Sequence, residues 1–202
     1  MPMTPGGAPR SDRPLAKPPT IGVERLEAFS DGDLADLCDA ASDAIEAGGG
    51  FGWVKPPPPH VLETYWNGVL MVPGRELFVG RLDGVIAGSA QLLHPPKNNE
   101  AQAFSAQLTT SFVAPWARGH GLARALLSAI EQAAIDCGYE LLKLDVRETQ
   151  TAAIALYETR GYVRWGVDPY YARVEDTVIR GFYYYKTLAP GTPSSGTLAT
   201  GS

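Results

Sequence analysis

The sequence lacks any run of apolar residues long enough to cross a bilayer, which takes about 18 in succession. Its first residues also lack the apolar segment of a secretory signal peptide. These two absences argue against a membrane or secreted protein. We therefore expect a cytoplasmic protein without a membrane partner.

Cysteine is scarce: Cys38 and Cys137 are far apart in the sequence and show no C-x-x-C spacing. Each falls in a segment with helical periodicity, so we expect buried, reduced thiols. His60 and His94 lie in proline-rich loops without ligand-like neighbours. From these patterns we expect no metal site.

Blocks of positive charge are missing as well. The chain has 17 Lys and Arg residues against 22 Asp and Glu residues, a net charge of −5. This balance argues against a nucleic-acid partner held by general electrostatics. The negative net charge weakly favours an amine as substrate, because amines are cationic in water.

The length and composition fit one domain. A chain of 202 residues with 45% hydrophobic side chains can bury a sizeable core. Residues 1–20 and 189–202 are rich in Pro, Gly, Ser and Thr and have no apolar periodicity. We expect disordered tails there around a single domain at residues 21–188, in a monomer or a homodimer.

The apolar patterns predict a mixed α/β fold. Ser30 and Asp31 are favourable N-cap residues, and Gly48 to Gly50 end the helix that follows. The run Pro56 to Pro59 predicts a loop, because proline lacks a backbone donor. Asp83-Gly84 predicts a tight hairpin. The expected strands are 21–29, 76–82, 85–93, 101–113, 141–146, 162–167 and 178–188, and the other expected helices are 60–71, 122–137 and 151–160.

Two glycines lie where a long strand gives way to a helix, in Arg118-Gly119-His120-Gly121-Leu122-Ala123. Glycines let consecutive N–H groups face one anion beside the positive end of a helix. Arg118, His120 and Arg124 add positive charge, so a pyrophosphate is the ligand that the pattern favours. The spacing is neither G-x-G-x-x-G nor a P-loop. Taken alone, the glycines could equally form a plain turn.

Two segments resemble the GNAT N-acetyltransferase superfamily. Val113 to Leu127 (VAPWARGHGLARALL) matches its acetyl-CoA signature, Arg/Gln-x-x-Gly-x-Gly/Ala. Gln150 to Tyr162 (QTAAIALYETRGY) resembles the family's Asn-x-x-Ala-x-x-Leu-Tyr-x-x-x-Gly-Phe, with Gln150 in place of the usual Asn. Within the superfamily, segments 48–53, 88–92, 141–145 and 181–188 look most similar to small-molecule acetyltransferases of the tabtoxin-resistance type.

This resemblance implies a fold and a cosubstrate. The fold is α/β, with a central mixed, mostly antiparallel sheet that is splayed at the acetyl-CoA site, between residues 108–113 and 141–146, and flanked by about four helices. The cosubstrate is acetyl-CoA. The residues implied to bind it are Phe112, Val113, Arg118, Gly119, His120, Gly121, Leu122, Ala123, Arg124, Gln150 and Ala153.

The resemblance also implies catalytic roles. Tyr157 aligns with the family's frequent general acid, which protonates the leaving thiolate; its alternative role is helix packing. The strand before the loop carries Gln102 and Gln107 where related enzymes often have a Glu. Asp145 is then the candidate base and Glu100 another, although Asp145 could instead cap or pair with Arg147.

The acceptor is implied less directly. Phe51, Trp53 and Tyr65 lie in the segment that covers the acceptor pocket in similar folds, although aromatic residues of this kind are more often core. The leading hypothesis is an acetyltransferase that acts directly on the amine of a small molecule, such as an amino acid, an antibiotic or a toxin. The alternatives are a protein N-terminal or lysine acetyltransferase and a non-catalytic acyl-CoA-binding module.

Overall fold

A computed structural model describes residues 17–30, 32–49 and 51–188. Residues 1–16 and 189–202, where we expect most of the disordered tails, lie outside the described residues, as do Asp31 and Gly50. No helix in the described part of the chain has the length and apolar character needed to span a bilayer.

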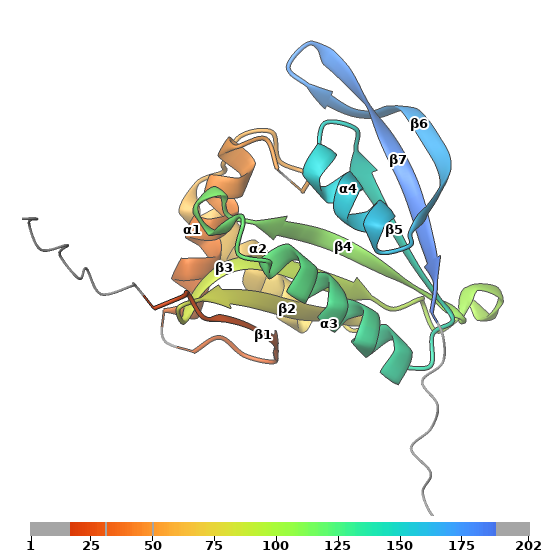
Figure 1. Ribbon diagram of the computed structural model, residues 1–202, viewed down its shortest axis with the longest axis horizontal. Helices are drawn as coiled ribbons and strands as arrows, with labels where there is room; N and C mark the ends of the chain where they lie inside the picture. Colours follow the sequence, from red (N-terminus) through yellow and green to blue (C-terminus); the bar gives the residue numbers. More distant parts are fainter. Residues whose placement is uncertain (1–16, 31, 50, 189–202) are drawn as a thin grey trace, which may run out of the picture.

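The described residues form one seven-stranded sheet with four α-helices around it (Figure 1). The strands lie in the order β1-β2-β3-β4-β5-β7-β6, and among them β4 and β5 are the sole parallel pair. This arrangement confirms the predicted mixed, mostly antiparallel fold. The strands are β1 (Ile21–Leu26), β2 (Arg75–Leu82), β3 (Val85–Leu93), β4 (Ser105–Val113), β5 (Leu141–Arg147), β6 (Val163–Val174) and β7 (Thr177–Thr187), and the helices are α1 (Asp33–Glu46), α2 (Pro59–Met71), α3 (Leu122–Asp136) and α4 (Thr151–Thr159).

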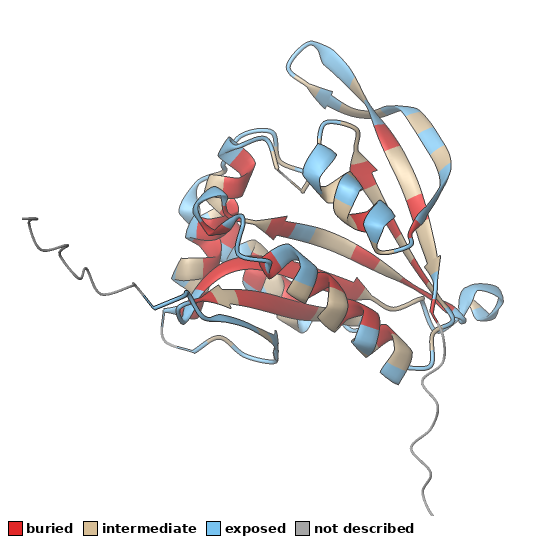
Figure 2. Cartoon of the chain, in the orientation of Figure 1, coloured by how far each residue is buried: buried red, intermediate tan, exposed pale blue. Residues whose placement is uncertain are grey.

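Helices cover both faces of the sheet. Side chains alternate between the two faces along β2. Leu77 and Val79 therefore pack in the layer with α1 and α2, whereas Phe78 packs in the opposite layer with α3 and α4. The central strands are therefore buried on both faces, while β6 at the edge is largely exposed (Figure 2). The sheet with its helices forms a rigid base for the segments between strands.

Several element boundaries differ from the prediction. The strand expected at 21–29 ends at Leu26, and the strand expected at 101–113 begins at Ser105, after a 3-10 turn at Glu100–Gln102. The first helix begins at Asp33, because Gly32 takes the N-cap position with φ +90° and the Ser30 hydroxyl donates to the Asp33 carboxylate. The second helix begins inside the proline run, at Pro59. Proline is tolerated in the first turn of a helix, where its missing N–H would have no intrahelical partner.

The sixth strand is much longer than the predicted 162–167, since β6 continues to Val174. Pro169 lies where the pairing of β6 with β7 shifts register, between Asp168 and Ala172. A proline is acceptable there because β6 is an edge strand and the bulge needs no ladder bond. The extension brings Tyr171 over Gly181 of β7, where its hydroxyl donates to Asp145 of β5.

Helix α4 is fixed from both sides. Glu131 of α3 is buried and accepts from Arg160 at 2.7 Å and from Lys186 of β7 at 2.9 Å. The Tyr184 hydroxyl donates to Glu158 at 2.9 Å. These contacts hold the C-terminal end of α4, directly after Tyr157.

Candidate active site

The two central strands of the sheet part from each other. Pairing between β4 and β5 covers only residues 105–107 and 141–143, and beyond these pairs the strands diverge (Figure 1). Residues 108–113 of β4 and 144–147 of β5 therefore leave a gap in the sheet. The splay lies within the ranges that the resemblance implies, 108–113 and 141–146, although residues 141–143 still pair with β4.

A bulge in β4 shapes one wall of the gap. The register between β3 and β4 shifts between Ser89 and Gln91, and opposite the shift Thr110 adopts φ +49°. A left-handed conformation is strained for a β-branched residue. The Tyr65 hydroxyl lies 3.4 Å from the Thr110 hydroxyl, so α2 supports the bulge from outside the gap.

Beyond the bulge, one backbone donor faces the gap. Ala114 donates to Ala87 of β3 at 2.8 Å, so these residues form a hydrogen-bonded pair. In an antiparallel ladder the next hydrogen-bonded pair is Phe112 with Ser89, and the intervening Val113 turns its N–H away from β3. Of Phe112 and Val113, which the resemblance implies to bind the cosubstrate, Val113 is thus the one whose N–H faces the parted strands.

The glycine loop leads directly into α3. Gly119 has φ +85° and Gly121, the N-cap residue, has φ +84°. A Cβ built on either glycine would meet no atom within 4 Å, so the space beside these N–H groups is open. The next residue, Leu122, is buried against Gly80 of β2, where a Cβ would come within 2.8 Å of the leucine side chain. The core thereby fixes the helix start below the open glycine loop.

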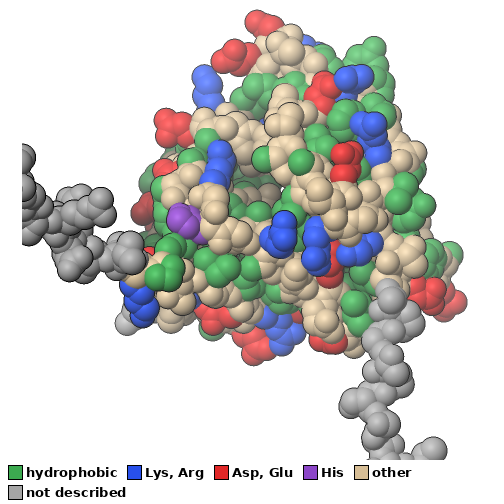
Figure 3. Space-filling model, in the orientation of Figure 1, with side chains coloured by type: hydrophobic (Ala, Val, Ile, Leu, Met, Phe, Trp, Pro, Cys, Tyr) green, Lys and Arg blue, Asp and Glu red, His purple; other side chains and the backbone are tan. Residues whose placement is uncertain are grey.

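Two cavities meet at the parted strands. The loop-side cavity, of about 340 Å³, runs between the end of α1, the glycine loop and α4. The strand-side cavity, of about 470 Å³, is lined by β4, β5, β6 and the segment after α1. Ser111, Gln150, Ala153 and Tyr157 line both cavities. Figure 3 shows the hollowed face, with hydrophobic side chains inside and Lys and Arg side chains beside it.

The predicted cosubstrate residues are distributed around the loop-side cavity. Its lining includes Phe112, Val113, Arg118, Ala123, Gln150 and Ala153. Gly119, His120, Gly121 and Arg124 are exposed on the loop and on the first turn of α3 without lining the cavity. The Gln150 amide donates to the Gly48 carbonyl at 2.7 Å, so this departure from the family's Asn joins α4 to the segment after α1.

Tyr157 lies at the junction of the two cavities and is 7% exposed. Burial raises the pKa of its phenol to about 12; a hydrogen bond with Ser111 opposes the rise and the Asp145 charge adds to it. The hydroxyl therefore keeps its proton at every pH near neutrality. A buried, protonated donor that faces two cavities is suited to general acid chemistry.

Asp145 projects from β5 into the strand-side cavity. Its carboxylate accepts from the Gln107 amide at 3.0 Å and from the Tyr171 hydroxyl. Arg147 makes no ion pair among the described residues, so the alternative that Asp145 pairs with Arg147 is wrong. The other base candidate, Glu100, lies in a 3-10 turn before β4 and lines neither cavity.

Tyr171 approaches Asp145 because β7 carries a glycine below it. A Cβ built at Gly181 would overlap the Tyr171 ring. Gly181 is the register partner of Arg147, two residues beyond Asp145 on β5. Burial, followed by the contact with Asp145, raises the pKa of the Tyr171 phenol above its usual range. Tyr171, Gly181, Gln107 and Ser111 are not among the predicted site residues, and a glycine inside a predicted strand was the available signal.

The predicted acceptor residues separate into lining and core. Phe51 lines the strand-side cavity and stacks on Phe112 with ring centroids 5.0 Å apart. Trp53 and Tyr65 line neither cavity and pack edge to face at 5.1 Å behind Phe51. Trp53 and Tyr65 are therefore packing residues, as the alternative interpretation has it, and they support the Phe51 ring, which lines the cavity.

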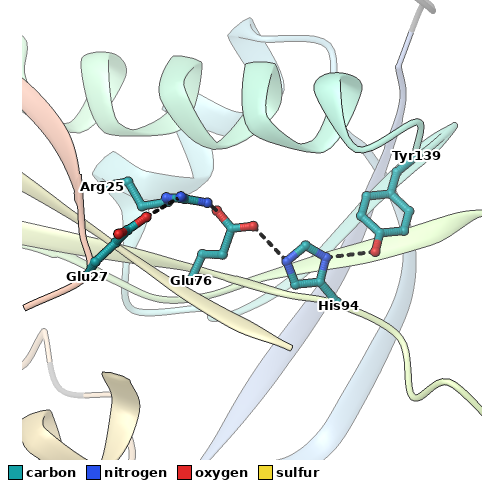
Figure 4. A network of polar contacts seen from close by, with 5 residues as sticks. All are labelled: Arg25, Glu27, Glu76, His94 and Tyr139. Carbon is teal, nitrogen blue, oxygen red and sulfur yellow. Dashed lines mark hydrogen bonds and ion pairs between the residues drawn. The ribbon is translucent and has the colours of Figure 1, made fainter. Parts of the chain in front are cut away.

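A separate polar network lies at the far ends of β2 and β3 (Figure 4). Glu76 accepts from Arg25 at 3.1 Å, its other oxygen lies 2.9 Å from His94 Nε2, and His94 Nδ1 lies 2.7 Å from the Tyr139 hydroxyl. His94 thus has partners that the sequence did not suggest. Cys137, contrary to the expectation of a buried thiol, is exposed, and its sulfur lies within 4.8 Å of a Glu76 carboxylate oxygen and a His94 ring nitrogen. Because Glu76 and His94 satisfy each other, we assign this cluster a structural role.

Comparisons with known proteins agree with this geometry. The sequence model of the acetyltransferase (GNAT) family matches residues 39–162. An uncharacterized N-acetyltransferase encoded in the hisH-hisA intergenic region of Azospirillum brasilense is 66% identical over 130 residues, which are 64% of this chain and 77% of that protein.

Solved structures show the same fold at low identity. The putative acetyltransferase yncA from Salmonella typhimurium, solved with its cofactor acetyl-CoA, has a TM-score of 0.68 and 16% identity over 84% of this chain and 95% of its own. A putative phosphinothricin N-acetyltransferase has a TM-score of 0.69 and 17% identity over 84% and 99%.

Proposed function

The chain belongs to the acetyltransferase (GNAT) family, whose members use acetyl-CoA as cosubstrate, and from that premise we propose that it transfers acetyl directly to an amine of a small molecule. The observation that carries this proposal is the meeting of two cavities across parted strands, at Ser111, Gln150, Ala153 and Tyr157. A cosubstrate and an acceptor that enter from opposite sides would meet at Tyr157.

The loop-side cavity fits acetyl-CoA. The open N–H groups at Gly119 and Gly121, beside Arg118, suit its pyrophosphate. The unpaired edge of β4, with the Val113 N–H facing the gap, suits the amide-bearing pantetheine arm. The acetyl group is supplied as a thioester, which is activated toward attack by an amine.

The residues around the junction supply the rest of the chemistry. The amine nitrogen forms a bond to the carbonyl carbon, the C–S bond breaks, and the carbonyl oxygen carries negative charge between these events. In this proposal the Val113 N–H stabilises that oxygen and the Tyr157 hydroxyl protonates the departing sulfur. Asp145, directly or through water, takes the proton that the amine loses.

Displacing Tyr171 should weaken the role of Asp145 as the base. In Gly181→Ala the new Cβ displaces the Tyr171 ring, so Asp145 loses one of its two donors. We expect kcat/KM for the acceptor to fall by about 3- to 10-fold, with the Kd for acetyl-CoA unchanged, since one hydrogen bond to a charged group is lost.

Steady-state kinetics on Gly181→Ala and Tyr171→Phe measure this effect, and the two variants should agree. Gly166→Ala on β6 is the matched control, because its Cβ would make only ordinary contact with Tyr183 at 3.6 Å. Normal kinetics in both test variants would remove the Tyr171 contact from the mechanism.

A screen of primary amines with acetyl-CoA, read by thiol release, tests the acceptor class. We expect turnover with amines of metabolite size, because the strand-side cavity is about 470 Å³ and Phe51 and Val54 help to line it. A screen in which only peptides react would favour the protein N-terminal or lysine acetyltransferase. Binding of acetyl-CoA without turnover of any amine would favour the non-catalytic module.

A further inference from the structure

The strand-side cavity carries two arginines without acidic partners. Its charged lining residues are Asp145, Arg147 and Arg173. Within the part of the chain that the structure describes, neither arginine forms an ion pair, and both line this cavity rather than the outer surface alone. In a chain with a net charge of −5, two guanidinium groups against one carboxylate make this cavity a local positive site.

Both arginines approach the cavity beside Tyr171. Arg147 ends β5 opposite Gly181, and its charge partly offsets the rise in the pKa of the Tyr171 phenol that burial and Asp145 produce. Arg173 is two residues after Tyr171 on β6, so the alternation of the strand gives both side chains the same face. The cavity thus places one carboxylate, already held by Gln107 and Tyr171, near two free guanidinium groups.

We propose that the acceptor carries an anionic group in addition to its amine, and that Arg147 and Arg173 bind this group. The inference rests on the proposed function and narrows its substrate class to amino acids and similar zwitterions. Guanidinium groups bind carboxylates and phosphonates through paired, charge-assisted hydrogen bonds. With the anion held at β5 and β6, the amine extends toward Asp145 and Tyr157, where the chemistry takes place.

The cosubstrate is the competing anion for these arginines. Arg147 and Arg173 do not line the loop-side cavity, which contains Arg118 beside the glycine loop. If they bound acetyl-CoA phosphates instead, removing either one would weaken acetyl-CoA binding. The two ligands are therefore separable by experiment.

The test compares amino acids with the amines left by removal of their carboxylate, such as methionine with 3-methylthiopropylamine and phenylalanine with phenethylamine. Wild-type kcat/KM should favour the amino acid of at least one pair by about 10-fold or more. Arg147→Gln and Arg173→Gln should each raise KM for that amino acid by about 10- to 100-fold and leave the matched amine and the Kd for acetyl-CoA unchanged. Arg164→Gln, on β6 with its guanidinium over the Phe182 ring at 4.7 Å, is the control and should behave as wild type.

Each other outcome overturns the inference in a recognisable way. If the wild-type enzyme acetylates the bare amines as well as the amino acids, the proposed function stands but the acceptor is not recognised through an anionic group. If Arg147→Gln or Arg173→Gln weakens acetyl-CoA binding, the two arginines bind the cosubstrate instead of the acceptor. No turnover of either series contradicts the proposed small-molecule function as well as the inference.

Discussion

Acetyl-CoA should raise the melting temperature of the wild-type protein, and this rise should vanish when Arg118→Ala is combined with Gly121→Val. A ligand at about 100 times its Kd that binds only the folded state adds about 2.7 kcal/mol. For a domain of this size that free energy corresponds to roughly 5–10 °C. Free acetate, which lacks the pyrophosphate, should give no shift.

The two substitutions act through different physics. Arg118 lines the loop-side cavity and supplies charge, which alanine removes. Gly121 leaves open space beside its N–H, and a valine there fills the path by which phosphate oxygens approach the start of α3. Valine at φ +84° is also strained, so the variant without ligand should melt at a lower temperature than wild type.

Gly138→Val provides the matched control for that strain. Gly138 follows the opposite end of α3, has φ +80°, and a Cβ there would also meet nothing within 4 Å. This variant should melt at a lower temperature yet keep the full shift with acetyl-CoA. Thermal denaturation with and without ligand separates the two effects, and a full shift in the double variant would make the loop a structural turn.

The sequence predicted the parts of this site that are local in the chain. The glycine loop with its helix start and the Asp83-Gly84 hairpin each depend on a few neighbouring residues, and the structure confirms these elements. The loop motif and the α4 motif together also predicted that Val113, Arg118 and Tyr157 would lie around one gap. The resemblance supplied that arrangement, because each motif alone carries no information on the other's position.

Contacts across the sheet could not be predicted. The partners of Asp145 are 38 residues before it and 26 residues after it, and their meeting depends on the registers of β4, β5, β6 and β7. The sequence pattern predicted that the sixth strand ends at residue 167. Its continuation to Val174 gives no apolar alternation, because it contains Pro169 and lies on the exposed edge strand β6. The strained Thr110 leaves no mark in the sequence either, since a bulge arises from pairing with β3.

Replacing Tyr157 by Phe should separate catalysis from binding. The substitution keeps the ring that packs between α4 and the core but removes the hydroxyl at the junction of the cavities. General acid catalysis typically contributes 10²–10⁴-fold, so we expect kcat to fall by at least about tenfold even where water partly substitutes. The Kd for acetyl-CoA should change little, because the lost interaction belongs to the transition state.

The pH dependence of this defect identifies its cause. Since burial holds the pKa of Tyr157 at about 12, the wild-type phenol remains protonated up to about pH 10 and its contribution does not titrate away. The thiol of coenzyme A has a pKa like that of cysteine, about 8.5, so the departing sulfur must gain a proton below that pH but can remain a thiolate above it. The ratio of wild-type to Tyr157→Phe kcat should therefore be largest near pH 7 and decline toward pH 9.5.

Parallel pH–rate profiles of the two proteins measure that ratio, and Tyr162→Phe is the matched control, because Tyr162 is buried beside Tyr157 and lines neither cavity. A phenol of such high pKa gives up its proton fully only to a sulfur whose own pKa is raised by the same burial. The hydroxyl then acts first as a hydrogen-bond donor to the charge that develops on sulfur. Equal kcat values for wild type and Tyr157→Phe at every pH would make Tyr157 a packing residue and leave protonation of the sulfur to water.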